Sequence, residues 1–261
     1  MAFLYVNNTM MKGLTILELL GNADRPTTLA EISRETGIPK STALGILRAM
    51  AERRFVEVGE GPSYRLGLRT FEVGAAYLRG VSPSTAAHPE LVSLVDKFGV
   101  TAHFAVLDGA QVVYVEKEDP VRASVRLASA VGTRLPAHHT AVGQAQLAFF
   151  EERELVAAVG SGPFTYLEGR ATRTLDELKC RLTKVRRMGY AVDDEETLEN
   201  VQCVAAPVFD ATGGCRGAVG VSFLKSRFGP RVDDVAAPVV AGAGRASERL
   251  GHRAGRGHRR A

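Results

Sequence analysis

Three segments in the second half of the sequence have residue types that suit ligand binding or catalysis. Residues 132–143 form a loop of small residues and histidines that leads into an expected helix start. Residues 193–196 are an acidic run after an expected strand. Cys203 directly precedes another strand-like run, and Ser222 lies on the strand expected next along the chain. Small residues at a helix start let a ligand approach backbone amides, which favour an anion such as a carboxylate. These segments are the candidates for a small-molecule site.

A catalytic interpretation of the same segments joins Cys203, His138 and Asp193 into a nucleophilic set. Their spacing matches no general motif, and the sequence does not show that they converge. A cysteine in an apolar strand is more often a small core residue, and paired histidines are more often structural. The chain also lacks a Walker loop, a dinucleotide fingerprint, an HExxH zinc motif and a nucleophile elbow. An enzyme using Cys203 is therefore the less favoured alternative, and we expect no metal or cofactor.

Residues 28–66 have the pattern of a helix, a turn, a second helix and a two-stranded wing. Thr28 precedes Glu31 by the spacing of a capping box, and Gly37 suits a helix end because glycine tolerates the left-handed conformation. Pro39 suits the start of the next helix. That helix has an apolar face with the helical period: Ala43, Ile46, Leu47 and Met50. Short strands are expected over 55–58 and 64–66.

This order of elements predicts a winged helix-turn-helix, whose second helix enters the DNA major groove. Arg48 can reach a guanine or a phosphate, Ser41 and Thr42 can bond phosphate or bases, and Leu44 can touch a thymine methyl. The residues expected at the DNA are Thr28, Lys40, Ser41, Thr42, Leu44, Gly45, Arg48 and Arg65.

The net charge of +4 is concentrated at the C-terminal end of the chain. Residues 245–261 hold six arginines and one glutamate, which sum to +5 and leave about −1 for the remainder. DNA affinity is therefore expected to depend on placed residues rather than on a broad positive field. The glycine- and arginine-rich residues 251–261 are expected to be a disordered tail.

The three cysteines contain no Cys-x-x-Cys pair, which is typical of a reducing cytoplasm rather than of a disulfide or zinc scaffold. No apolar run approaches the ~20 residues of a membrane span, and the start of the chain lacks the features of a signal peptide. We therefore expect a cytoplasmic protein without a membrane partner.

The rest of the chain mixes hairpins and helices without regular β-α-β alternation, which predicts an α+β domain with a largely antiparallel sheet. Asp108-Gly109 is a strong hairpin signal between strand-like runs at 101–107 and 111–117. Further strands are expected over 190–193, 204–209 and 216–223, and helices over 90–98, 139–150, 174–189 and 231–250. An apolar stripe at Leu68, Phe71, Ala75 and Leu78 predicts a connecting helix. The expected domains are 1–66, a linker helix over 67–82, 83–250, and the tail 251–261.

In this order, the segments resemble the IclR (isocitrate lyase regulator) family of bacterial transcription factors over about residues 10–250. In the first domain the resemblance rests on residues 37–42 and on Tyr64-Arg65-Leu66-Gly67. In the second it rests on residues 135–143, on 189–196 and on 203–208. It implies a homodimer or a dimer of dimers, a palindromic operator in double-stranded DNA, and a GAF-like domain that binds a small carboxylate or aromatic effector.

The residues that the resemblance places at the effector are Leu127, Ala141, Val142, Asp193, Val201, Cys203, Gly220 and Ser222. The chain departs from the family at two of the positions named above. Gly45 stands where an arginine-type residue is usual, and Gly220 stands where some members have a serine that bonds the effector. The favoured function is an effector-responsive, DNA-binding repressor. The alternatives are an activator of a catabolic operon, a sensor whose DNA-binding domain has degenerated, and the enzyme using Cys203.

Overall fold

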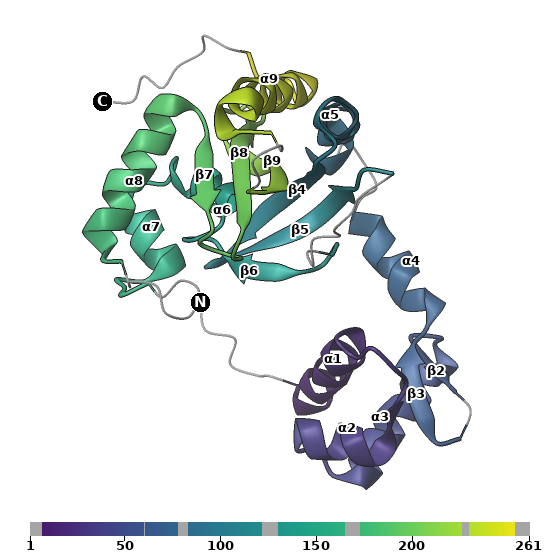
Figure 1. Ribbon diagram of the computed structural model, residues 1–261. Coiled ribbons are helices and arrows are strands. Elements are labelled where there is room, and N and C mark those ends of the chain that lie inside the picture. Colours follow the sequence, from purple (N-terminus) through teal and green to yellow (C-terminus); the bar gives the residue numbers. More distant parts are fainter. Residues whose placement is uncertain are drawn as a thin grey trace. The chain divides into compact units, whose positions relative to one another are not determined.

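The computed structural model describes residues 7–59, 61–77, 83–121, 130–164, 173–225 and 230–253. The chain divides into two compact units, Met1–Arg79 and Gly80–Ala261 (Figure 1). Leu127 from the expected effector site and residues 254–261 of the expected tail lie outside the described residues. No helix in the described ranges combines the length and apolar character that crossing a membrane requires.

The smaller unit is a winged helix-turn-helix, as predicted. Its elements are α1 (Asn8–Gly21), β1 (Thr27–Thr28), α2 (Leu29–Thr36), α3 (Lys40–Glu52), β2 (Val56–Val58), β3 (Ser63–Leu66) and α4 (Leu68–Tyr77). The three strands form an antiparallel sheet in the order β1-β3-β2. The helices enclose a core centred on Ile16, Ile32 and Leu47, each fully buried. The sequence patterns did not predict α1 or β1.

Local signals set where α2 begins and ends and where α3 begins. The capping box is present: the Glu31 amide donates to the Thr28 hydroxyl at 3.3 Å, and the Thr28 amide donates to the Glu31 carboxylate at 2.8 Å. Gly37 ends α2 in the left-handed conformation with φ 69°. Pro39, with φ −54°, is the N-cap of α3. The expected roles of Gly37 at the end of α2 and of Pro39 at the start of α3 are therefore confirmed.

The larger unit is built on one antiparallel sheet. Its elements are α5 (Pro83–Phe98), β4 (Thr101–Asp108), β5 (Gln111–Glu118), β6 (Arg134–Pro136), α6 (Ala141–Leu147), α7 (Glu152–Val159), α8 (Leu175–Met188), β7 (Ala191–Asp194), β8 (Val201–Phe209), β9 (Cys215–Leu224) and α9 (Val232–Arg249). The six strands lie in the order β6-β5-β4-β9-β8-β7. The α+β prediction with an antiparallel sheet is confirmed, including the β4–β5 hairpin at Asp108-Gly109.

The two faces of this sheet have different compositions. Large apolar side chains such as Phe104, Val204 and Val221 fill the face that α5 and α9 cover (Figure 1). The opposite face carries small side chains, among them Ala105, Ala205 and Ala218, and α6 packs directly on it. Alternation along each strand separates the two sets. The small residues leave room between α6 and the sheet.

Two expected helices have different bounds in the structure. The helix expected over 90–98 begins at Pro83 and includes Pro89. Buried Ala86 and Ala87 pack against α9, and this packing outweighs the unfavourable helix propensity of the proline. The helix expected over 139–150 is confined to Ala141–Leu147. The sequence patterns also did not predict β6 and α7.

Candidate DNA interface and ligand cavity

Helix α3 has one buried face and one exposed polar face. Ala43 and Leu47 are fully buried in the core of the smaller unit. Lys40, Ser41, Gly45 and Arg48 are exposed. Thr42 and Leu44 are half-buried beside them. The structure therefore gathers six of the residues expected at DNA on one helix.

The remaining two expected DNA contacts lie elsewhere in the same unit and already have partners. The Thr28 hydroxyl caps α2 through Glu31. Arg65 on β3 donates to the Glu57 carboxylate of β2 at 2.8 Å, and both side chains are exposed. Surface ion pairs of this kind are weak, so a DNA phosphate can compete with Glu57 for Arg65. Thr28, in contrast, has a structural role in starting α2.

The larger unit contains a cavity of about 220 Å³ between α6 and the small-residue face of the sheet. Its described lining residues combine aliphatic side chains with hydroxyl, thiol, carboxyl and imidazole groups: His103, Tyr114, Thr133, Leu135, Thr140, Ala141, Val142, Asp193, Thr197, Leu198, Val201, Cys203 and Ser222. Ligand pockets have this composition of apolar walls with a few placed polar groups, although those for drug-sized molecules are larger, about 300–1,000 Å³. The cavity therefore suits a small ligand.

Most residues that the family resemblance placed at the effector line this cavity. They are Ala141, Val142, Asp193, Val201, Cys203 and Ser222. Gly220 is absent from the described lining residues, because it lies under the imidazole of His103. The loop from 132 to 140 contributes Thr133, Leu135 and Thr140, and Thr140 caps α6 by accepting a hydrogen bond from Gly143 at 3.1 Å.

A polar row crosses the cavity floor on neighbouring strands. Asp193 pairs with Cys203 across β7 and β8, and Cys203 pairs with Ser222 across β8 and β9. Asp193 is 2% exposed and accepts hydrogen bonds from the Glu196 amide at 2.7 Å and from the Thr197 hydroxyl at 2.5 Å. Burial raises the pKa of Asp193 to about 6, despite these hydrogen bonds. At pH 7 the row therefore combines a mainly ionised carboxylate with a thiol and a hydroxyl group.

His103, Tyr114 and Thr197 are polar lining residues that the sequence patterns did not identify. His103 on β4 is 2% exposed, and its ring lies edge-on to Tyr114 on β5 at 5.0 Å between ring centroids. One signal was available, since a histidine interrupts the otherwise apolar run 102–107 of an expected strand. The register that brings β4 beside β9 is a long-range property that the sequence pattern did not give.

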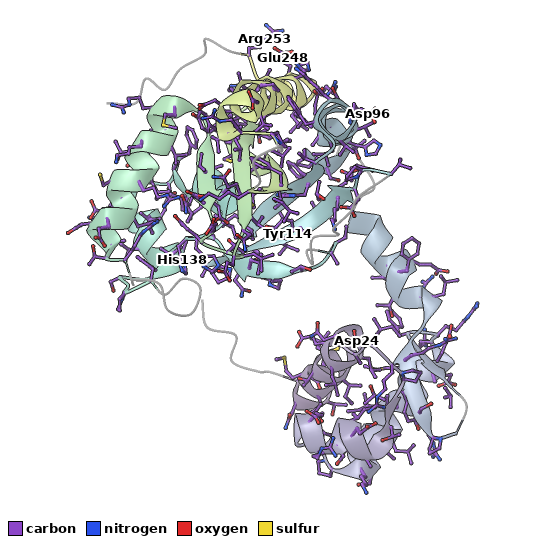
Figure 2. All side chains as sticks on the ribbon, viewed as in Figure 1. Asp24, Asp96, Tyr114, His138, Glu248 and Arg253 are labelled. Carbon is purple, nitrogen blue, oxygen red and sulfur yellow. The ribbon has the colours of Figure 1, made fainter. Side chains whose placement is uncertain are left out.

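The expected alternative of a Cys-His-Asp nucleophile is not assembled by the described residues. His138 is not among the residues that line the cavity; its ring packs on Phe164 with centroids 5.0 Å apart, away from Tyr114 (Figure 2). Burial raises the pKa of the Cys203 thiol, whereas nucleophilic cysteines have a lowered pKa. Cys203 is therefore suited to contacting a ligand rather than to attacking one.

Comparisons with known proteins agree with this architecture. The family model of the IclR helix-turn-helix domain matches residues 9–59, and that of the bacterial transcriptional regulator IclR C-terminal domain matches residues 75–247. The HTH-type transcriptional regulator XynR of Escherichia coli (strain K12) is 31% identical over 224 residues, covering 85% of this chain and 87% of XynR. The transcriptional repressor IclR of the same strain is 28% identical over 237 residues, covering 89% and 86%.

Solved structures show the same fold over almost the whole chain. The crystal structure of a putative transcriptional regulator from Rhodococcus sp. RHA1 has a TM-score of 0.81 at 28% identity and covers 95% of this chain and 99% of its own. Both units are thus matched in sequence and in structure. The chain therefore belongs to the IclR family of bacterial DNA-binding transcriptional regulators.

Proposed function

We propose that this regulator is a repressor that binds operator DNA through α3 and responds to a small carboxylate or aromatic molecule in the cavity under α6. The observation that carries the proposal is the cavity itself, which combines apolar walls with the polar row Asp193, Cys203 and Ser222. A repressor is favoured over an activator because a matched relative, IclR of Escherichia coli, is named a repressor.

The proposed assembly is a homodimer, or a dimer of dimers, on a palindromic operator. Two recognition helices of a dimer reach half-sites about one helical turn apart, roughly 34–36 Å. The ligand acts by population shift: it binds one arrangement of the dimer better than another, and the DNA-binding affinity changes with the population. Differential affinity of the cavity for the ligand in the two arrangements sets the size of the response.

The DNA-binding part of the proposal is tested with DNA from the region upstream of the protein's own gene, against unrelated DNA, across a salt series. Arg48→Ala should weaken specific binding by about 1–3 kcal/mol. Arg153→Ala is the matched control, since Arg153 is an exposed arginine on α7 of the larger unit. Equal affinity of both variants for the operator would contradict the proposal that α3 contacts the DNA.

The ligand part is tested by adding fractionated small-molecule extract to the protein–operator complex. A fraction that releases wild-type protein should have a weaker effect on Ser222→Ala, whose affinity for DNA alone should be unchanged. A reporter gene then gives the sign of regulation, because deletion of a repressor raises expression and deletion of an activator lowers it. If no fraction changes operator binding, the cavity is not a regulatory site.

A further inference from the structure

His103 and Gly220 form a matched pair on the cavity side of the sheet. They lie directly opposite each other in the register of β4 and β9. A Cβ atom built on Gly220 would lie 2.8 Å from His103 Nε2 and 2.8 Å from a methyl carbon of Val142 on α6. Real side chains do not approach this closely, so the imidazole occupies the space that any larger residue at position 220 would need.

The imidazole of His103 is held in place by packing, but one of its two nitrogen atoms has no hydrogen-bond partner in the part of the chain that the structure describes. Its Nδ1 atom is buried with no hydrogen-bond partner among the described residues. The ring packs edge-on against Tyr114 and lines the cavity. Buried polar groups in folded proteins nearly always have a partner, so an unpaired one beside a cavity indicates a role for something bound there.

The charges around the ring restrict what that partner can be. Burial first, and then the nearby Lys117, lower the pKa of His103 to about 4, so the imidazole is neutral at pH 7. A neutral imidazole has one donor and one acceptor nitrogen, which is the hydrogen-bonding pattern that a hydroxyl group complements. No lysine or arginine is among the cavity-lining residues that the structure describes, and Asp193 is one of them. A ligand with two negative charges would therefore bury one of them beside the Asp193 carboxylate without a cationic partner.

We propose that His103 selects the ligand of this cavity by bonding a neutral hydroxyl substituent, and that Gly220 is required because it leaves space for the imidazole. The ligand class is then a small hydroxylated compound with at most one negative charge. This inference rests on the proposed regulatory function, since it specifies the ligand of the same cavity.

The test uses a matched set of rigid probes in titration calorimetry with the full chain: benzoate, 3-hydroxybenzoate, 4-hydroxybenzoate, isophthalate and terephthalate. At least one hydroxybenzoate should bind wild-type protein about tenfold more tightly than benzoate, the effect of one hydrogen bond. The two dicarboxylates should bind no more tightly than benzoate. His103→Leu should reduce the hydroxyl preference to less than about threefold, and His103→Gln, which keeps a donor and an acceptor, should retain part of it.

A second pair of variants tests the role of Gly220. Gly220→Ala should lower both the melting temperature and the affinity for the preferred hydroxybenzoate, because the new methyl group displaces the imidazole. His103→Ala/Gly220→Ala should recover part of the melting temperature, because only the close contact with Val142 remains, but it should not recover the hydroxyl preference. Melting temperature and ligand affinity are measured for each variant, and operator binding by the ligand-free protein is the control for folding.

Three results would overturn the inference: a hydroxyl preference that is unchanged in His103→Leu, a dicarboxylate that binds more tightly than both hydroxybenzoates, or no binding of any probe to the wild-type protein. Each is distinguishable from failure of the proposed function. That function fails only if no small-molecule fraction alters operator binding, which is measured separately and without these probes.

Discussion

The thiol of Cys203 lies 3.1 Å from the hydroxyl of Ser222, within hydrogen-bond distance across β8 and β9 on the cavity floor. Burial raises the pKa of the thiol, so it stays protonated at neutral pH. A protonated thiol beside a hydroxyl is a weak hydrogen-bonding pair that a ligand can join. A protonated thiol is also a poor nucleophile, so the pair favours ligand binding over nucleophilic attack.

The first prediction concerns thiol reactivity. At pH 7 iodoacetamide should modify the exposed Cys180 first, with Cys203 labelled far more slowly because it is half-buried and protonated. Peptide mass spectrometry over time measures both rates in one sample. The Cys180→Ser variant is the control and should lose the fast phase. Rapid labelling of Cys203 in folded protein would revive the enzymatic alternative.

The second prediction concerns Asp193 and pH. Its pKa is about 6 in the folded protein, above the ordinary 3.8, so the folded state binds the proton more tightly than the unfolded state does. Wild-type stability therefore falls as pH rises from about 4 to about 6 and gains nothing from this group above that. Asp193→Asn lacks this loss, so its free energy of unfolding relative to wild type should increase by roughly 2 kcal/mol over that window.

Asparagine is the appropriate replacement because Asp193 organises the loop after β7. It accepts hydrogen bonds from the amides of Glu196 and Thr197 and from the Thr197 hydroxyl, and an asparagine oxygen can still accept from the two amides. Asp193→Ala would lose all three bonds, so it would confuse loop stability with the effect on charge. Urea unfolding at pH 4 and pH 7 measures the difference. If the difference in free energy of unfolding between Asp193→Asn and wild type did not change with pH, the pKa of Asp193 would not be raised in the folded protein.

Local signals predicted the DNA-binding unit better than the cavity. Thr28, Gly37 and Pro39 act through their own backbone and nearest neighbours, so their types and spacing were sufficient to predict α2 and α3. Asp108-Gly109 predicted the β4–β5 hairpin for the same reason. Helix α1 was missed because its apolar face includes Gly13, so its helical period is weak.

The cavity depends on contacts between residues far apart in the sequence. His103 meets Gly220 only because β4 lies beside β9, and strand order is set by packing of the whole unit rather than by either segment. The family resemblance identified Asp193, Cys203 and Ser222 as site candidates, and these do line the cavity. It did not identify His103, because none of the segments that carried the resemblance lies on β4.

The third prediction concerns glycines of the helix-turn-helix. Gly45 lies on the exposed face of α3, and a Cβ there would meet nothing within 4 Å. Gly45→Ala should therefore stabilise the smaller unit by about 1 kcal/mol, the difference in helix propensity. Gly37→Ala should destabilise it by a similar amount, because Gly37 has φ 69°. Hydrogen exchange of α2 and α3 amides in the full chain measures both; the same sign for both variants would contradict the helix boundaries.

The last prediction concerns the wall of the cavity. Gly143 lies on α6 so close to the preceding loop that a Cβ would come within 2.2 Å of the Ala137 carbonyl oxygen. Gly143→Ala should push this loop away from α6 and destabilise the larger unit by about 1–3 kcal/mol, the usual cost of overpacking. Ligand affinity should fall with it because Thr140, Ala141 and Val142 form that wall, whereas binding to unliganded operator should remain. Gly244→Ala on α9, where a Cβ meets nothing within 4 Å, is the matched control and should be neutral or stabilising. Thermal unfolding with and without ligand separates the two variants, and an equal effect of both would mean that Gly143 is not required for the close approach of the loop to α6.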